Sequence, residues 1–309
     1  MKTYDNVSAQ RISWVKSNKK NLEAQKGIKK LFYPETLEEL RDLIMTLNNN
    51  SEQYDIMGYS SNTLFLPSYT ADNVVCTKYV NSWKDTDKGF VCDCGVAISK
   101  ISKYAIERGY IGFEGLTDLP GTVAAGIYGN CGCRGCAVNK IVESFSMLTP
   151  DNRIIELTPQ QLELKYRSSS LKRHEIQGVI LQIKLIRKIG KAEELIKIAE
   201  KNHLIRKNNQ PTGANNLGTT FNGGKIYTVK GFLFNLLEKV IQVISATSDR
   251  RISFPKALRL VGKKKFIPYL FNPQRYMFLD EKSHDLFDEY YTFMKSLYKD
   301  FRLEIEIRK

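Results

Sequence analysis

A glycine-rich stretch in the middle of the chain, LPGTVAAGIYGNCG (119–132), most limits what this sequence can fold into. It combines several glycines and a proline with almost no charge, so neither a long helix nor a well-packed strand is expected there. Small residues let a flat or anionic ligand touch the backbone, where N–H groups can serve phosphate oxygens. A ligand-binding loop and a tight turn without a ligand both remain open.

The chain has the length and composition of a soluble globular protein. Its 309 residues predict two or three folding units, and a hydrophobic content of 42% with 26% charged residues is ordinary. The first twenty residues lack the apolar core of a signal peptide. No run approaches the roughly 18 apolar residues of a membrane span. We therefore expect a cytoplasmic protein without a membrane span, either a monomer or a weak dimer.

The charge balance is strongly basic, with 47 Lys and Arg against 33 Asp and Glu and a net charge of +14. Such a charge favours nucleic acid, anionic lipid or phosphate-bearing small molecules, although a lysine-rich solvated surface explains it equally. The sequence contains no zinc finger, RNA-recognition signature or heptad-backed basic region. Nucleic acid is therefore not expected as a partner.

Three of the six cysteines form a C-x-C-x-x-C cluster: Cys131, Cys133 and Cys136. Zinc normally takes a fourth ligand, and no histidine lies nearby to complete the set. Without an export signal, a chain of this size favours reduced thiols. We interpret the cluster as small residues in a crowded loop and expect no metal site.

The hydrophobic pattern predicts alternating helices and strands. Thr36-x-x-Glu39 is a capping box before a helix of about three turns, and strands follow at YDIM, TLFL and NVVC. Next come a strand at GFVCDCGV, a helix that ends before Gly109, and strands at 142–157 and 178–188. Helices at 191–207 and 281–301 and a terminal strand complete the chain. The aromatic stripe of the last helix is interpreted as core.

Three further segments carry polar groups that suit a site. The turn Gly58–Asn62 adds two hydroxyls and an amide to its glycine, and YRSSSLK (166–172) concentrates an arginine, three hydroxyls and a lysine. Thr219 and Thr220 follow a glycine. A hydroxyl gives or takes a proton only where its surroundings assist it. A polar turn is the alternative for each segment.

Taken together, these motifs resemble the UDP-N-acetylenolpyruvoylglucosamine reductase (MurB) family. GFEGLTDLPGTVAAGIYGNCGCRG is similar to that family's flavin-binding segment, and MGYSSNTLF to its G-G-G-S-N-L-L turn. YRSSSLK resembles Y-R-x-S-x-F-K, GTTF resembles G-S-x-F, and LEIEIRK resembles L-x-P-E-V-R. The five motifs occur in the family's order, and the resemblance is strong through residue 190 and thin afterwards.

The resemblance implies an α+β protein with the two-subdomain FAD-binding fold of the vanillyl-alcohol-oxidase and MurB type. It implies FAD-binding subdomains at 1–80 and 81–190 and a divergent C-terminal α+β substrate domain at 191–309. FAD would be held non-covalently, with NADPH as co-substrate. The residues implied to bind the cofactor are Gly58, Tyr59, Ser60, Ser61, Asn62, Thr63, Pro120, Gly121, Thr122, Ala125, Gly126, Asn130, Cys131, Gly132 and Val179.

The resemblance also implies roles in catalysis. Arg167 would polarise the substrate carboxylate, Thr219 would replace the family's serine as proton donor, and Glu306 matches an assisting glutamate. A fixed cation and a nearby proton donor are what a carbanion next to a carboxylate requires. Tyr166, Ser169 and Lys172 would contact the substrate.

The departures from the family pattern cluster where the substrate should bind. Asn209 stands at a lysine position, and Asn222 and Gly223 replace polar residues after G-S-x-F. We therefore expect an FAD-dependent, NAD(P)H-using reductase, similar to UDP-N-acetylmuramate dehydrogenase. Its substrate would be an enolpyruvyl UDP-sugar or a related sugar nucleotide in cell-wall or surface-polysaccharide (capsule) biosynthesis. The alternatives are a flavin-dependent oxidase or dehydrogenase of a sugar or alcohol, and a non-catalytic flavin-binding paralogue.

Overall fold

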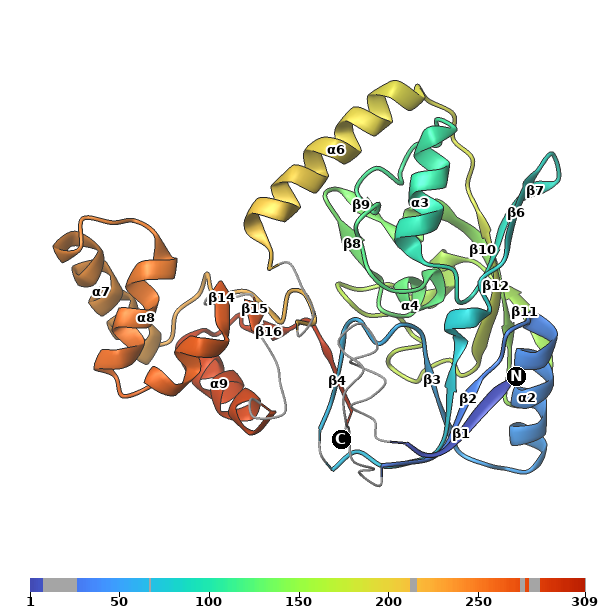
Figure 1. The fold of residues 1–309 in the computed structure, drawn as a ribbon, viewed down its shortest axis with the longest axis horizontal. Helices are drawn as coiled ribbons and strands as arrows, with labels where there is room; N and C mark the ends of the chain where they lie inside the picture. The colour runs from blue at the N-terminus through green and yellow to red at the C-terminus, as the bar shows by residue number, and fades with distance from the viewer. Residues whose placement is uncertain (8–26, 67, 212–215, 273–275, 278–283, 309) are drawn as a thin grey trace. The chain divides into compact units, whose positions relative to one another are not determined.

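The computed structural model describes residues 1–7, 27–66, 68–211, 216–272, 276–277 and 284–308 (Figure 1). The chain divides into two compact units. The first unit contains the described residues up to Ser60 together with Tyr69–Arg206, and the second contains Ser61–Ser68 and the described residues from Lys207 onward. The second unit is thus built from two stretches that are far apart in the sequence.

The first sheet of the first unit has the strand order β1-β2-β5-β3. Strand β1 is antiparallel to β2, whereas β2 and β3 both run parallel to β5. Helix α2 follows β2, and the Thr36 side chain caps it by accepting a 3.1 Å hydrogen bond from the Glu39 N–H, as the capping box predicts. The bounds are β1 (Lys2–Val7), β2 (Ile28–Tyr33), α2 (Leu37–Asn49), β3 (Tyr54–Met57) and β5 (Ala71–Cys76).

The second sheet is antiparallel throughout, in the order β11-β10-β12-β7-β6. Helix α3 ends as predicted, with Gly109 just beyond it at φ +74°. The bounds are β6 (Trp83–Thr86), β7 (Gly89–Asp93), α3 (Ile98–Glu107), α4 (Val123–Tyr128), β8 (Gly132–Cys133), β9 (Cys136–Ala137), α5 (Val138–Ile141), β10 (Val142–Leu148), β11 (Ile154–Leu157), β12 (Val179–Leu185) and α6 (Ala192–Asn209).

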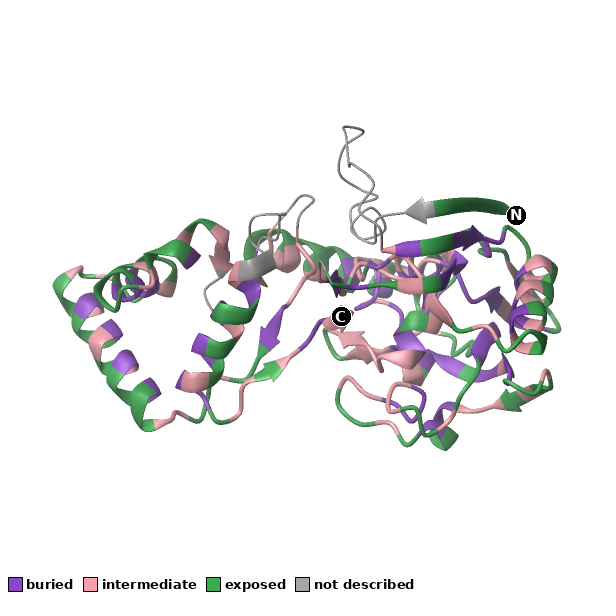
Figure 2. Ribbon diagram, turned by 90° about the horizontal axis from the view of Figure 1, so that it is seen from below, coloured by how far each residue is buried: buried purple, intermediate pink, exposed green. Residues whose placement is uncertain are grey.

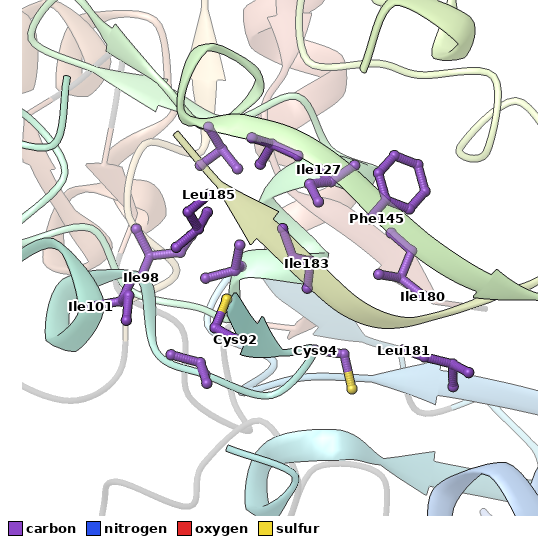
Figure 3. Close-up of a cluster of buried hydrophobic side chains, with 14 of the residues drawn as sticks. Cys92, Cys94, Ile98, Ile101, Ile127, Phe145, Ile180, Leu181, Ile183 and Leu185 are labelled. Carbon is purple, nitrogen blue, oxygen red and sulfur yellow. The ribbon is translucent and has the colours of Figure 1, made fainter. Parts of the chain in front are cut away.

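The core of the first unit forms where these strands meet α3 and α4. Cys92 of β7 lies opposite Ile183 of β12, and both side chains are buried among those of Ile98 and Ile127 (Figure 3). Cys94 is buried in the same cluster. Burial raises the pKa of the Cys94 thiol to about 12, so this sulfur acts as a core side chain rather than a nucleophile.

Helices dominate the second unit, with three two-stranded sheets beside them. Its bounds are β4 (Thr63–Phe65), β13 (Phe221–Asn222), α7 (Val229–Ile244), α8 (Arg250–Leu260), β14 (Leu270–Asn272), β15 (Tyr276–Met277), α9 (His284–Leu297), β16 (Arg302–Leu303) and β17 (Glu306–Arg308). Figure 2 shows these helices banded in purple and green, each with a buried and an exposed face.

The aromatic stripe of α9 belongs to the core of this unit, as predicted. Phe287, Tyr290, Phe293 and Leu297 are all buried, and Phe287 stacks on Phe221 with ring centroids 5.8 Å apart. A burial of this size contributes several kcal/mol, at about 1.5–3 kcal/mol for each large apolar side chain. The predicted terminal strand is interrupted: β16 and β17 pair with different partners, β13 and β4.

The fold is the α+β fold predicted from the sequence. Two sheets with helices build the first unit, one with its strands at 2–76 and the other with its strands at 83–185, and a mainly helical unit follows. The domain limits at 80 and 190 remain predictions. Among the described residues, no helix is long and apolar enough to cross a membrane.

Candidate cofactor and substrate site

The turn that begins at Gly58 lies at the carboxyl end of β3. Because β2, β3 and β5 are parallel, their carboxyl ends share one edge of the sheet, where open α/β sheets bind ligands. The Thr77 hydroxyl donates to the carbonyl of Met57 at 3.1 Å, and the Cys76 thiol donates to the carbonyl of Gly58 at 3.3 Å. The end of β5 therefore fixes the start of the turn.

The glycine-rich stretch folds back on the segment between β7 and α3. Gly121 has φ +111°, and its carbonyl accepts a 3.0 Å hydrogen bond from the Ile98 N–H. Val123 donates to the carbonyl of Val96 at 2.9 Å. The Thr122 side chain caps α4 by accepting from the Ala125 N–H at 3.2 Å. The short helix α4 was not predicted, but its local capping residue explains it.

The structure brings these two predicted loops together. A Cβ atom added to Gly58 would lie 2.8 Å from the Oγ1 of Thr122 and 2.9 Å from its Cγ2. The backbone of one turn therefore lies directly against the buried capping side chain of the other, with no room for a methyl group between them. The lack of a side chain at Gly58 is a steric requirement of this contact.

The predicted segment YRSSSLK (166–172), together with the preceding Lys165, packs against the far end of α4. The hydroxyl of Ser169 donates to the carbonyl of Tyr128 at 2.7 Å, and the amide of Asn130 donates to the carbonyl of Lys165 at 2.7 Å. Arg167 has φ +53°, and its guanidinium carbon lies 5.7 Å from the centre of the Tyr166 ring. The Gly58 turn and the Arg167 segment thus both contact the glycine-rich stretch, although the three motifs are spread over residues 58–172.

Arg167 also influences the thiol of Cys131. Burial raises the pKa of Cys131 to about 12, and the positive charge of Arg167 acts in the opposite direction. Cys133 and Cys136 face each other across a two-residue hairpin turn, and both are partly exposed. Within the described parts of the chain, no three His, Cys, Asp or Glu side chains gather as metal ligands.

The other predicted catalytic residues lie in the second unit. The Glu304 N–H donates to the carbonyl of Thr220 at 2.9 Å, and the Glu306 N–H donates to the carbonyl of Asn62 at 2.8 Å. The Asn62 amide donates to the carbonyl of Glu304 at 3.0 Å. The segments that carry Thr219 and Glu306 are therefore joined by backbone bonds. Arg167 belongs to the first unit, and Thr219 and Glu306 belong to the second.

The residues predicted for the site, whether for cofactor, substrate or catalysis, differ in how far they are exposed. Pro120, Ala125 and Asn62 are exposed. The side chains of Thr122 and Val179 are buried. Ser60, Gly126 and Ser169 are buried as well, and a Cβ at Gly126 would lie 2.9 Å from Val138. The remaining predicted residues are partly exposed, apart from Tyr166, which is exposed: Gly58, Tyr59, Ser61, Thr63, Gly121, Asn130, Cys131, Gly132, Arg167, Lys172, Thr219 and Glu306.

The sequence interpretation missed the segment that supports the glycine-rich loop. Cys94 and Val96 provide the backbone partners of Ala124 and Val123, and a Cβ at Gly95 would lie 1.9 Å from the carbonyl oxygen of Thr77. The available signal was Gly95 near the end of the predicted strand GFVCDCGV, because a glycine inside a strand pattern indicates a close approach of two backbones.

Comparison with known proteins identifies a family that matches part of the chain and several similar reductases. Residues 28–158 match the FAD binding domain family. The UDP-N-acetylenolpyruvoylglucosamine reductase of Clostridium tetani is 27% identical over 191 residues, which cover 62% of each chain. That of Synechocystis sp. is 28% identical over 192 residues, or 61% of this chain and 60% of the relative. The match therefore spans about three fifths of the length of these relatives.

A solved structure extends the likeness to nearly the whole chain. The UDP-N-acetylenolpyruvylglucosamine reductase (MurB) from Thermus caldophilus superposes with a TM-score of 0.63 and 18% identity. The superposition covers 91% of this chain and 92% of that one. At this identity the likeness concerns the fold, and it agrees with the α+β architecture described above.

Proposed function

We propose that this chain, a divergent member of the UDP-N-acetylenolpyruvoylglucosamine reductase (MurB) family of FAD-binding proteins, is an FAD-dependent, NAD(P)H-using reductase. Its substrate is an enolpyruvyl UDP-sugar or a related carboxylated sugar nucleotide. The observation that carries the proposal is the meeting of the Gly58 turn, the glycine-rich loop and the Arg167 segment within the first unit.

The residues at this place suit a flat dinucleotide cofactor. The Gly58 turn packs directly against the Thr122 side chain of the glycine-rich loop, at the carboxyl edge of three parallel strands, where backbone N–H groups of both turns can serve a pyrophosphate. We assign the cofactor to residues 58–63 and 120–122, to Ala125 and Gly126, to residues 130–132 and to Val179. The buried residues of this set, such as Thr122, hold the loop in its conformation. When bound, FAD carries hydride between the nicotinamide and the substrate's carbon–carbon double bond.

Arg167 and Thr219 act on the charge that forms in the substrate. Hydride addition to an enolpyruvyl group places negative charge on the carbon next to its carboxylate. The guanidinium of Arg167 binds that carboxylate and stabilises the charge, and the Thr219 hydroxyl delivers the proton that removes it. Glu306 assists this transfer.

The substrate class follows from charge and from the departures in the second unit. Tyr166 and Lys172 offer an exposed ring and a cation beside Arg167, and Ser169 holds the segment in place through Tyr128. The net charge of +14 favours a nucleotide diphosphate. Asn209, Asn222 and Gly223 stand where the family has polar or basic residues, so we do not limit the substrate to that of the family. We assign a sugar nucleotide of cell-wall or surface-polysaccharide synthesis, used by a cytoplasmic enzyme.

The proposal is tested with the purified full chain. We expect a yellow protein whose flavin is released by acid and whose absorbance is bleached by NADPH under anaerobic conditions. Enolpyruvyl-UDP-N-acetylglucosamine, or a carboxylated sugar nucleotide of the same class, should restore the absorbance faster than oxygen does.

Two results would contradict the proposal. Rapid reoxidation by oxygen together with turnover of a simple sugar or alcohol would indicate a flavin oxidase. A colourless preparation that takes up no FAD would indicate a protein without flavin chemistry. In that case Arg167, Thr219 and Glu306 would be remnants of an ancestral site.

A further inference from the structure

Helix α7 in the second unit exposes a long apolar surface. Its exposed residues are mostly large and hydrophobic, and several are more than half accessible, such as Val243 at 81% and Phe232 and Leu233 at 59% each. Contiguous apolar surface of this kind marks an interaction site in soluble proteins. The exposed apolar residues, which we call the α7 stripe, are Val229, Phe232, Leu233, Leu236, Val240, Val243 and Ile244.

The α7 stripe is straight and has a cation at each edge. At about 100° per residue, its seven members fall within an arc of about 120° along a helix of about 24 Å. Lys230 and Lys239 are exposed and project about 80–100° to either side of its centre. An apolar stripe flanked by long cationic side chains is the arrangement of helices that lie in a lipid interface, where lysines reach up to the headgroups.

Contacts on the opposite side of α7 hold the helix so that the α7 stripe faces outward. Glu238 is buried and forms an ion pair with Arg250 of α8, with Oε1 at 2.8 Å from Nε, and it accepts from Ser253 at 2.8 Å. A Cβ at Gly231 would lie 1.7 Å from the carbonyl oxygen of Leu297, so α7 approaches α9 closely there. Because α7 is apolar on nearly all sides, these two contacts determine which residues face outward.

The part of the sequence that carries the stripe is strongly positive. Residues 225–265 contain ten Lys or Arg and two acidic residues, a net charge of +8 out of +14 for the whole chain. Both acidic residues are paired within this segment, Glu238 with Arg250 and Asp249 with Arg251. A third cation, Lys265, pairs with Glu289 of α9.

We propose that the α7 stripe binds the surface of an anionic membrane, with its apolar side chains among the acyl chains and its basic border on the lipid phosphates. Charge complementarity selects this occupant. A second copy of the chain would bring the exposed Lys230 and Lys239 of one stripe against those of the other, and nucleic acid would leave seven exposed apolar side chains without a partner. The proposal is independent of the reaction assigned above.

The test is sedimentation of the full chain with vesicles of phosphatidylcholine alone, or of phosphatidylcholine and phosphatidylglycerol in equal parts. We expect binding to the second kind, weakened by salt. Leu233→Ser should weaken it about tenfold. Lys230→Gln with Lys239→Gln should weaken it by about fivefold for each lysine. The matched controls are Leu204→Ser, equally exposed at 59% on α6, and Lys197→Gln with Lys201→Gln on the same helix.

The proposal is overturned if neither vesicle binds the protein, or if the α6 variants weaken binding as much as the α7 variants. It is also overturned if the protein is a dimer that Leu233→Ser converts into a monomer, because a second copy then covers the stripe. Circular dichroism of each variant shows that loss of binding is not loss of fold.

Discussion

The hydroxyl of Ser169 donates a 2.7 Å hydrogen bond to the carbonyl of Tyr128, the last residue of α4. It also accepts from the Lys172 N–H at 3.2 Å. The neighbouring hydroxyl of Ser170 is similarly buried, yet it has no hydrogen-bond partner within the described structure. The two adjacent serines are therefore similarly buried but differ in the hydrogen bonds of their hydroxyl groups.

This difference predicts opposite results for two small changes. Ser169→Ala should lower the free energy of unfolding of the first unit by about 1–3 kcal/mol, since it leaves the Tyr128 carbonyl without this donor. Ser170→Ala should be neutral or slightly stabilising, since it removes an unsatisfied polar atom. Urea unfolding of both variants measures the difference. Equal losses of unfolding free energy in the two variants would show that the hydrogen bonds of Ser169 do not contribute to stability.

The contact between Gly58 and Thr122 predicts that alanine is not tolerated at position 58. The added methyl group would lie 2.8 Å from Oγ1 of Thr122, so one of the two turns must shift. Overpacking of this kind costs about 1–3 kcal/mol, and we expect FAD to be lost on gel filtration. Gly129→Ala is the control: φ there is −88°, and its Cβ would meet only the Ala125 carbonyl, at 3.5 Å. Retention of flavin by Gly58→Ala would contradict the prediction.

The proposed role of Thr219 predicts a selective kinetic defect. Thr219→Val keeps the shape of the side chain and removes its hydroxyl, so reoxidation by the sugar nucleotide should slow about 10²–10⁴-fold. Bleaching by NADPH should be unchanged. Thr219→Ser keeps the hydroxyl and should stay within about tenfold of the parent. Stopped-flow absorbance follows both steps, and an unimpaired Thr219→Val would remove Thr219 from the mechanism.

Asp300 predicts a pH dependence in the second unit. Its carboxylate accepts from the backbone N–H groups of Gly224, Lys225 and Ile226 at 3.0–3.2 Å. Burial raises the pKa of this carboxyl group, the three hydrogen bonds lower it, and the result lies below the usual 3.8. The carboxylate therefore stabilises the fold above the unfolded pKa, and this contribution is lost as the pH falls through the folded pKa.

Asp300→Asn should reveal this contribution. Near pH 6 the variant should be less stable than the parent by about 1–3 kcal/mol, and the gap should close as the pH falls through the folded pKa of Asp300. Asp288→Asn, an exposed carboxylate on α9, is the control. Denaturant unfolding across this range measures the gap, and a gap that does not depend on pH would refute the assignment.

The sequence was informative where a local rule decides the structure. The Thr36 cap, the end of α3 before Gly109 and the buried aromatic residues of α9 were all predicted correctly, because capping, glycine conformation and helical period act over a few residues. The same holds for the glycine-rich loop, whose composition indicated close approach. That Thr122 fills the space beside Gly58 depends on packing and could not be derived.

Other features had no local signal. Helix α7 carries large apolar side chains on its exposed face as well as on its buried face, and no helix was predicted there. The segment Cys94–Ala97 became part of the site through backbone bonds, which any residue can make. The pairing of β17 with β4 joins residues that no sequence pattern relates.

The pairing of β17 with β4 affects how the protein folds during synthesis and how it can be divided into fragments. Asn62 and Glu304 are bonded across 242 residues, and β4 finds its parallel partner only in β17. On the ribosome, β4 must wait for most of the protein to be made before its contacts exist, as expected for a fold of high contact order. A gene fragment that encodes residues 207–309 alone would yield helices without one of their strands. To be studied in isolation, the second unit needs residues 61–68 supplied by a linker or a circularly permuted chain.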